Sequence, residues 1–237
     1  MGRKIVKVPG VNGLGNTSGT RNAGNLLLEK VEGGRVEEIH VDNDNLNEQE
    51  KLIFQNSRDL FLEEESVVFL GGDHSISYSI CRAFFEKFKN GKLVVFDAHA
   101  DCMPAMKEPT HEEWLRALIE RYGITGDRIM IIGLNKVEPE EKEFLDKMGV
   151  KQSESVEELK EFLDGSKLYV SFDIDVFKDA LATGYPEGKM SKEKIIELVE
   201  IVSSADWKGM DLVEINLDKE GVEETLELAN VVLRNFL

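Results

Sequence analysis

Short, continuous apolar runs alternate along the chain with longer stretches in which apolar residues recur at helical spacing. The run Val67–Leu70 is wholly apolar and rich in β-branched and aromatic residues, as strands buried on both faces of a sheet are. Ile80, Phe84 and Phe88 follow at four-residue intervals, which places them on one face of a helix. Strands that alternate with helices predict a three-layer α/β/α fold with a mostly parallel sheet.

The same pattern predicts where most of the elements lie. We expect strands at Ile5–Val8, Val36–Val41, Ser66–Leu70, Leu93–Phe96, Ile129–Ile132 and Leu168–Phe172, and a last strand that ends with Leu212–Ile215. We expect further helices at Ala23–Val31, Asn45–Leu62, Glu112–Tyr122, Pro139–Met148, Val156–Leu163, Ser191–Ser203 (with Ser191 as its N-cap) and Val222–Phe236. The length and the absence of internal repeats favour one domain over residues 1–237.

Three of the predicted strands are followed directly by clusters of histidine and aspartate. These are the segments GGDHS (71–75), DAHAD (97–101) and the end of SFDID (171–175). Within DAHAD the two carboxylates and the imidazole alternate, and alternate residues share one side of an extended chain. Because ligands bind at the carboxyl ends of strands in open α/β sheets, we expect the three clusters to meet there.

Together the clusters supply a set of candidate metal ligands without any thiolate. Carboxylates and imidazoles of this kind suit Mn²⁺ better than a structural zinc ion. The set is larger than one ion needs, whereas two ions about 3.5–4 Å apart with bridging carboxylates would use all of it and could generate hydroxide near neutral pH. The candidate ligands are His74, Asp97, His99, Asp101, Asp173 and Asp175.

Composition and charge exclude some partners. The formal net charge is −17, so the chain lacks the basic patch that a nucleic-acid site requires. The acidic surface favours solubility, and it could also attract metal ions and a cationic substrate. The two cysteines, Cys81 and Cys102, give no disulfide framework and are expected as buried fillers. Without a signal peptide or a long apolar segment, the sequence predicts a cytoplasmic protein with no membrane contact.

The three motifs, in this order and each after a strand, resemble the signatures of the arginase, agmatinase and formiminoglutamase family, the ureohydrolases. The resemblance continues through the segment ATGYP (182–186) and through Val213–Asn216. It implies an arginase-like fold with an eight-stranded sheet and two Mn²⁺ ions per chain. By the same resemblance, Asp97 and Asp173 would bridge the ions, His74 and Asp101 would complete one coordination shell, and His99 and Asp175 the other.

The resemblance also implies roles for residues around the metals. His111 would carry protons, Asp101 would also orient the attacking hydroxide, and Glu214 would pair with a guanidinium group. Glu138 and Thr183 would contact the rest of the substrate. The family resemblance further implies a homo-oligomer, a trimer or a hexamer.

The substrate follows less directly from the sequence. Where arginases usually carry an asparagine for the amino-acid head group, this chain has Met103, while Glu138 keeps an acid for a distal amine. Agmatine, which lacks a carboxylate, fits both features, so we expect a dinuclear manganese hydrolase that releases urea and an amine. The segment after Asp175 is shorter than usual, and Tyr185 stands where the family has a threonine.

Several alternatives remain open. The chain could have arginase or guanidinobutyrase activity, or hydrolyse a formimino group as formiminoglutamases do. It could also be an inactive metal-binding member of the family, although the complete ligand set argues against this. The related deacetylase branch uses a single zinc ion, which fits six ligands less well.

Overall fold

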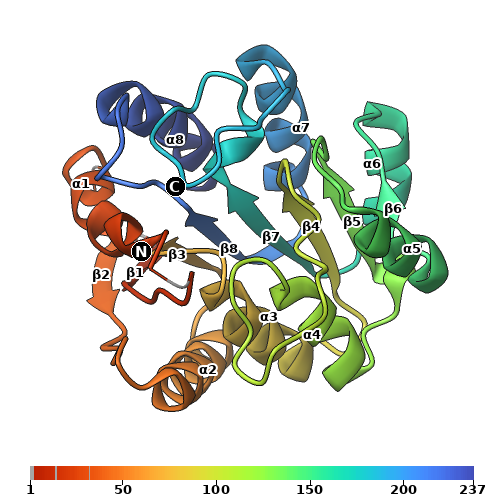
Figure 1. Cartoon of the computed structure of the whole chain (residues 1–237), viewed down its shortest axis with the longest axis horizontal. Helices are drawn as coiled ribbons and strands as arrows, with labels where there is room; N and C mark the ends of the chain where they lie inside the picture. The colour runs from red at the N-terminus through yellow and green to blue at the C-terminus, as the bar shows by residue number, and fades with distance from the viewer. Residues whose placement is uncertain (1–2, 14, 32) are drawn as a thin grey trace.

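A twisted, all-parallel sheet runs through the middle of the molecule (Figure 1). The structure is a computed structural model that describes residues 3–13, 15–31 and 33–237. In this part of the chain the sheet has eight strands in the order β2-β1-β3-β8-β7-β4-β5-β6, which confirms the predicted fold class. The strands are β1 (Lys4–Val8), β2 (Arg35–Glu38), β3 (Val67–Gly71), β4 (Lys92–Phe96), β5 (Ile129–Ile132), β6 (Lys151–Gln152), β7 (Leu168–Asp173) and β8 (Trp207–Val213).

Helices cover both faces of this sheet and complete the three layers. One face packs against α1 (Ala23–Glu29), α6 (Val156–Leu163), α7 (Lys192–Ser204) and α8 (Val222–Phe236). The other packs against α2 (Leu46–Glu63), α3 (Ile76–Lys87), α4 (Trp114–Tyr122) and α5 (Pro139–Met148). Figure 1 shows α7 and α8 on one side of the strands and α2, α3 and α4 on the other. None of the helices described is long and apolar enough to span a bilayer.

The apolar runs form strands because both of their faces are buried. In β3, Val68 and Leu70 belong to the core under α1 and α8, whereas Val67 and Phe69 belong to the core under α2 and α3. Consecutive side chains of a strand point to opposite faces, so a strand between two helical layers must be apolar at every position.

Helix ends follow local hydrogen bonding. Ser191 caps α7, as predicted, because its side chain accepts a hydrogen bond from the Lys194 N–H. At α5, the side chains of Glu138 and Glu141 form a capping box. The predicted helix at Glu112 begins later, at Trp114, because the Glu113 carboxylate accepts hydrogen bonds from the N–H and hydroxyl of Thr110 and holds a turn there.

The predictions were least accurate at the sheet edges and strand ends. The edge strand β6 was not predicted, since Lys151 and Gln152 are exposed and carry no apolar pattern. The strand predicted at Val36–Val41 is shorter in the structure than expected, because β2 is an exposed edge strand and ends at Glu38. The last strand starts at Trp207 and stops at Val213, since the next residue, Glu214, has a φ of 68°.

The partly buried carboxyl of Glu50 on α2 gives a prediction about stability. Burial raises its pKa to about 7, which the Arg121 guanidinium opposes only in part. The unfolded value is about 4.3, so ionising Glu50 costs stability as the pH rises through 7. We expect Glu50→Gln to raise the free energy of unfolding by about 1 kcal/mol at pH 8, a figure reduced for partial exposure, and by less at pH 5. Urea denaturation at both pH values measures this, with the exposed Asp59→Asn as control; an equal gain at both would contradict it.

Candidate metal centre

The three motif clusters lie at one edge of the sheet, at the carboxyl ends of β3, β7 and β4, and Glu214 follows β8 at the same edge. These four strands are neighbours in the sheet, in the order β3-β8-β7-β4, although they are distant in sequence. A cavity of about 350 Å³ opens there and is lined by His74, His99, Asp101, Asp173 and Asp175. A second cavity, of about 470 Å³ beside α1 and β2, is lined by none of the candidate ligands.

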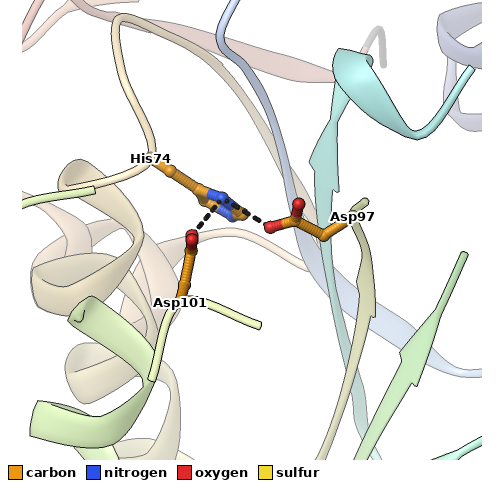
Figure 2. A group of neighbouring side chains, drawn as sticks. All are labelled: His74, Asp97 and Asp101. Carbon is orange, nitrogen blue, oxygen red and sulfur yellow. Dashed lines mark ion pairs between the residues drawn. The ribbon is translucent and has the colours of Figure 1, made fainter. Parts of the chain in front are cut away.

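One group of ligands gathers around His74, which lies between β3 and α3. Its Nδ1 atom is 2.9 Å from Asp101 Oδ2, 3.1 Å from Asp97 Oδ2 and 3.3 Å from Asp173 Oδ2. Figure 2 shows the carboxylates of Asp97 and Asp101 approaching the imidazole from two sides. All four side chains are buried.

A second group gathers around His99. Its Nδ1 atom lies 2.8 Å from Asp175 Oδ2 and 3.5 Å from Asp97 Oδ1. The two oxygens of Asp97 therefore face different histidines, and Asp97 belongs to both candidate ligand groups. The structure thus brings five of the six predicted ligands together as two groups that share Asp97, and it places the sixth, Asp173, beside the first group, 3.3 Å from His74 Nδ1.

The outer nitrogen of each histidine is held by a partner that the sequence did not suggest. His74 Nε2 lies 2.9 Å from the Ser171 hydroxyl, which in turn donates to Asp211 Oδ1 at 2.8 Å. His99 Nε2 lies 3.1 Å from Glu187 Oε2. Partners of this kind fix the orientation of metal-binding histidines and leave Nδ1 facing the ligands. The sequence signal was a carboxylate, Asp211, between the apolar residues Met210 and Leu212 of β8.

The two imidazoles hold protons tightly in this environment. Burial opposes the charge of His74, but Asp101, Asp173 and Asp97 outweigh burial and hold the pKa of His74 well above its usual range. Burial likewise opposes charge on His99, and the carboxylates of Asp175 and Asp97 raise its pKa. A metal ion that binds here has to displace these protons.

The carboxyls show that negative charge is crowded in the site. Burial and the charge of Asp97 raise the pKa of Asp101 to about 6. Burial, followed by the charges of Asp175 and Asp97, raises the pKa of Asp173 well above its usual range. Asp97 is the exception: its contacts with His74 and His99 outweigh burial and lower its pKa. Divalent cations would relieve the repulsion that these shifts report.

Two buried atoms test whether the residues fit a metal ion. His74 Nδ1 and Asp97 Oδ2 lie 3.1 Å apart, yet within the described residues neither has a partner in hydrogen-bonding geometry. Buried polar atoms normally have partners, and atoms that face a common point rather than each other are typical of ligands around a cation. The donors are oxygens and imidazole nitrogens, which suit Mn²⁺, so the site fits the expected ions.

The backbone carries strain at two of the predicted site residues. Asp101 has a φ of 50° and Glu214 a φ of 68°, and across the described ranges Asp164, at a helix end, is the only other non-glycine residue with positive φ. Such strain concentrates at functional sites. The φ of Asp101 also shows that the DAHAD segment bends, so its ligands converge through a turn and not through the extended backbone that the alternation suggested.

Comparison with known proteins identifies the family of this chain. Residues 15–237 match the model of the arginase family. The chain belongs to the arginase family. It is 31% identical over 180 residues to the agmatinase of Bacillus subtilis (strain 168) and 32% identical over 165 residues to the guanidinobutyrase of Pseudomonas aeruginosa. These matches cover 71% and 62% of this chain, but only 61% and 52% of the relatives.

Solved structures share the fold of this chain over its whole length. The crystal structure of formimidoylglutamase from Bacillus subtilis subsp. subtilis str. 168 superposes with a TM-score of 0.88 at 19% sequence identity. The match covers 100% of this chain and 86% of that protein. The chain spans about three fifths or less of the curated relatives but superposes over its full length on this structure, which confirms the resemblance inferred from the motifs.

Glu214 lies where the family resemblance predicted it, beside the ligands. It directly follows β8 and is buried, and its Oε1 atom accepts a hydrogen bond from the His74 N–H at 2.8 Å. The segment that carries Glu214 lies against Gly72, whose carbonyl accepts the Glu214 N–H at 3.0 Å. A side chain on Gly72 would collide with the Gly10 carbonyl, so only glycine fits. Burial and the charges of Asp173 and Asp73 raise the pKa of Glu214 well above its usual range.

The remaining predicted residues line the same cavity. His111 is buried, its ring stacks on Tyr185 with centroids 6.2 Å apart, and neither ring nitrogen has a hydrogen-bond partner among the described residues. Thr183 is buried and its hydroxyl accepts the Tyr185 N–H at 3.3 Å. Glu138 is exposed at the cavity mouth, where its side chain also caps α5.

Proposed function

We propose that this arginase-family chain is a dinuclear manganese hydrolase that cleaves a guanidinium C–N bond and releases urea and an amine, with agmatine as the favoured substrate. The observation that carries the proposal is the pair of ligand groups that share Asp97, beside a cavity in which Glu214 is also present. The first group would be completed by Asp173, as the family resemblance implies.

Two divalent cations bound there would lower the pKa of a water molecule and stabilise charge that develops on the substrate. The chain's own residues would do the rest. Glu214 Oε1 is engaged by the His74 N–H, which leaves Oε2 to accept a hydrogen bond from the guanidinium. Asp101 would orient the nucleophile toward the planar carbon. His111, whose ring nitrogens are without partners among the described residues, would carry a proton to the leaving amine.

The cavity mouth supports a substrate with a second positive charge and no carboxylate. Glu112, Glu138 and Glu187 line it, and its one lysine, Lys136, is paired with Glu187 at 3.3 Å. An ammonium would be attracted to this acidic mouth, whereas the carboxylate of arginine would be repelled. Met103, also in the lining, offers no amide to a carboxylate. These features favour agmatine over arginine.

The family resemblance also supports a homo-oligomer, a trimer or a hexamer, and we propose that the protein works in the cytoplasm. Both cysteines are free and buried, which agrees with a reducing compartment. Size-exclusion chromatography with light scattering would test the oligomeric state.

The proposed activity is tested by a product screen with Mn²⁺-loaded protein. Agmatine, arginine, guanidinobutyrate, guanidine and formiminoglutamate are each offered, and urea, ammonia and formamide are measured. We expect urea release, with the highest kcat/KM for agmatine. Formamide from formiminoglutamate without any urea would replace the proposal by formimino hydrolysis, and no turnover of any compound would indicate an inactive metal-binding protein.

His111 gives a separate prediction about proton transfer. Because a positioned acid or base contributes about 10²- to 10⁴-fold, His111→Ala should lower kcat by about 10²-fold or more while metal content stays unchanged. His40→Ala is the control, since His40 is exposed and lies outside the cavity lining. Unchanged kcat in His111→Ala would remove the proton-transfer role.

A further inference from the structure

Trp114 touches two of the candidate metal ligands, although no motif pointed to it. It is fully buried at the start of α4, and its indole Nε1–H donates a hydrogen bond to Asp101 Oδ2 at 2.7 Å. Its ring lies against the His74 imidazole, with centroids 4.8 Å apart. The hydrogen bond closes the irregular segment between Asp101 and α4 and directly orients the Asp101 carboxylate.

Asp101 needs such a partner more than the other ligands do. Its backbone has a φ of 50°, and it stands at the start of a loop rather than inside a strand or helix. Its Oδ2 atom already faces His74 Nδ1 at 2.9 Å, so rotation of the carboxylate would change the geometry of the whole group around His74. The indole N–H fixes this rotation.

An indole is chemically suited to hold a metal-binding carboxylate. It can only donate a hydrogen bond, and it carries no charge at any accessible pH. A lysine or arginine at this place would neutralise Asp101 and compete with a cation, whereas the indole orients the carboxylate and leaves its charge available. Ser171 holds His74 in a comparable way, and Glu187 holds His99.

We propose that Trp114 is a positioning residue of the metal centre, which holds Asp101 for the ion that Asp101 would share with His74 and Asp97. The fluorescence emission of Trp114 would also report whether that ion is bound. This inference rests on the dinuclear centre of the proposed function, but not on the identity of the substrate.

The chain provides a matched control, because it contains only two tryptophans. Trp207 is also buried and packs against Phe236, with ring centroids 5.1 Å apart. It begins β8, whereas the metal centre lies beyond the carboxyl end of this strand, a separation of about 20 Å for seven residues. Trp207→Phe therefore makes the same chemical change in the core without touching the site.

Mn²⁺ titration by calorimetry is the first measurement. We expect Trp114→Phe to bind one of its two ions about 10- to 100-fold more weakly, as loss of a supporting hydrogen bond to a ligand typically does, and Trp207→Phe to bind both ions like the wild type. A combined Asp101→Ala and Trp114→Phe variant should bind Mn²⁺ no more weakly than Asp101→Ala alone, because alanine leaves no oxygen for the indole N–H to orient. A purely structural role of Trp114 would instead weaken binding equally in both backgrounds.

Fluorescence gives a second measurement that does not require Trp114→Phe to fold. In Trp207→Phe only Trp114 emits, and Mn²⁺ should change its emission; in Trp114→Phe only Trp207 emits, and it should not respond. The inference is overturned if Trp114→Phe binds both ions with wild-type affinity, or if Trp114 emission is unchanged when two ions bind. A wild-type protein that binds no Mn²⁺ would overturn the proposed function and this inference together. If the wild type binds two ions but Trp114→Phe binds them equally well, only this inference is overturned.

Discussion

Asp97→Asn is expected to bind neither cation tightly, whereas Asp175→Asn should keep one. Asp97 belongs to both ligand groups, since Oδ2 lies 3.1 Å from His74 Nδ1 and Oδ1 lies 3.5 Å from His99 Nδ1. Asp175 belongs only to the group around His99. Both substitutions remove one buried charge and keep the side-chain shape. The two variants therefore differ only in whether they change both ligand groups or one.

Elemental analysis after dialysis measures this difference directly. We expect two ions per chain in the wild type, about one in Asp175→Asn and close to none in Asp97→Asn. Turnover by Asp97→Asn should fall by about 10³-fold or more, the equivalent of the several kcal/mol that metal ions supply. A single ion in the wild type, or two ions retained in Asp97→Asn, would refute the shared-ligand arrangement.

Glu214→Gln should lower kcat/KM for a guanidinium substrate by about 10²- to 10³-fold, roughly 3–4 kcal/mol of transition-state stabilisation. A bound guanidinium would lower the raised pKa of Glu214 and pair with its carboxylate through a charge-assisted hydrogen bond, whereas glutamine keeps the shape without the charge. The amide oxygen can still accept the His74 N–H that Oε1 accepts now. Metal content and thermal stability should therefore change little.

Steady-state kinetics on agmatine, together with metal analysis, tests the role of Glu214. Glu161→Gln is the matched control, because Glu161 is exposed on α6 and lies outside the cavity lining. It should leave kcat/KM unchanged, since exposed charges away from the site contribute little. Wild-type kinetics in Glu214→Gln would remove its role in substrate binding, and loss of metal would instead make it a support for His74.

The sequence by itself determined the layered fold and indicated the candidate ligands. The run Val67–Leu70 predicted a strand buried on both faces, and the structure places its alternate residues in two cores. The histidines and aspartates were found because each cluster directly follows such a strand. Where the apolar signal was absent, as at Lys151 and Gln152 in β6, the strand was not predicted.

Only the tertiary structure decided which distant groups support those ligands. The order β3-β8-β7-β4 brings Ser171 and Asp211 behind His74, and the return of the chain into α4 brings the Trp114 N–H to Asp101. The loop after β7 likewise brings Glu187 to His99. Hydrophobic periodicity reports whether a side chain is buried, but a hydrogen bond between distant segments depends on strand order and loop path, and local patterning carries no information about either.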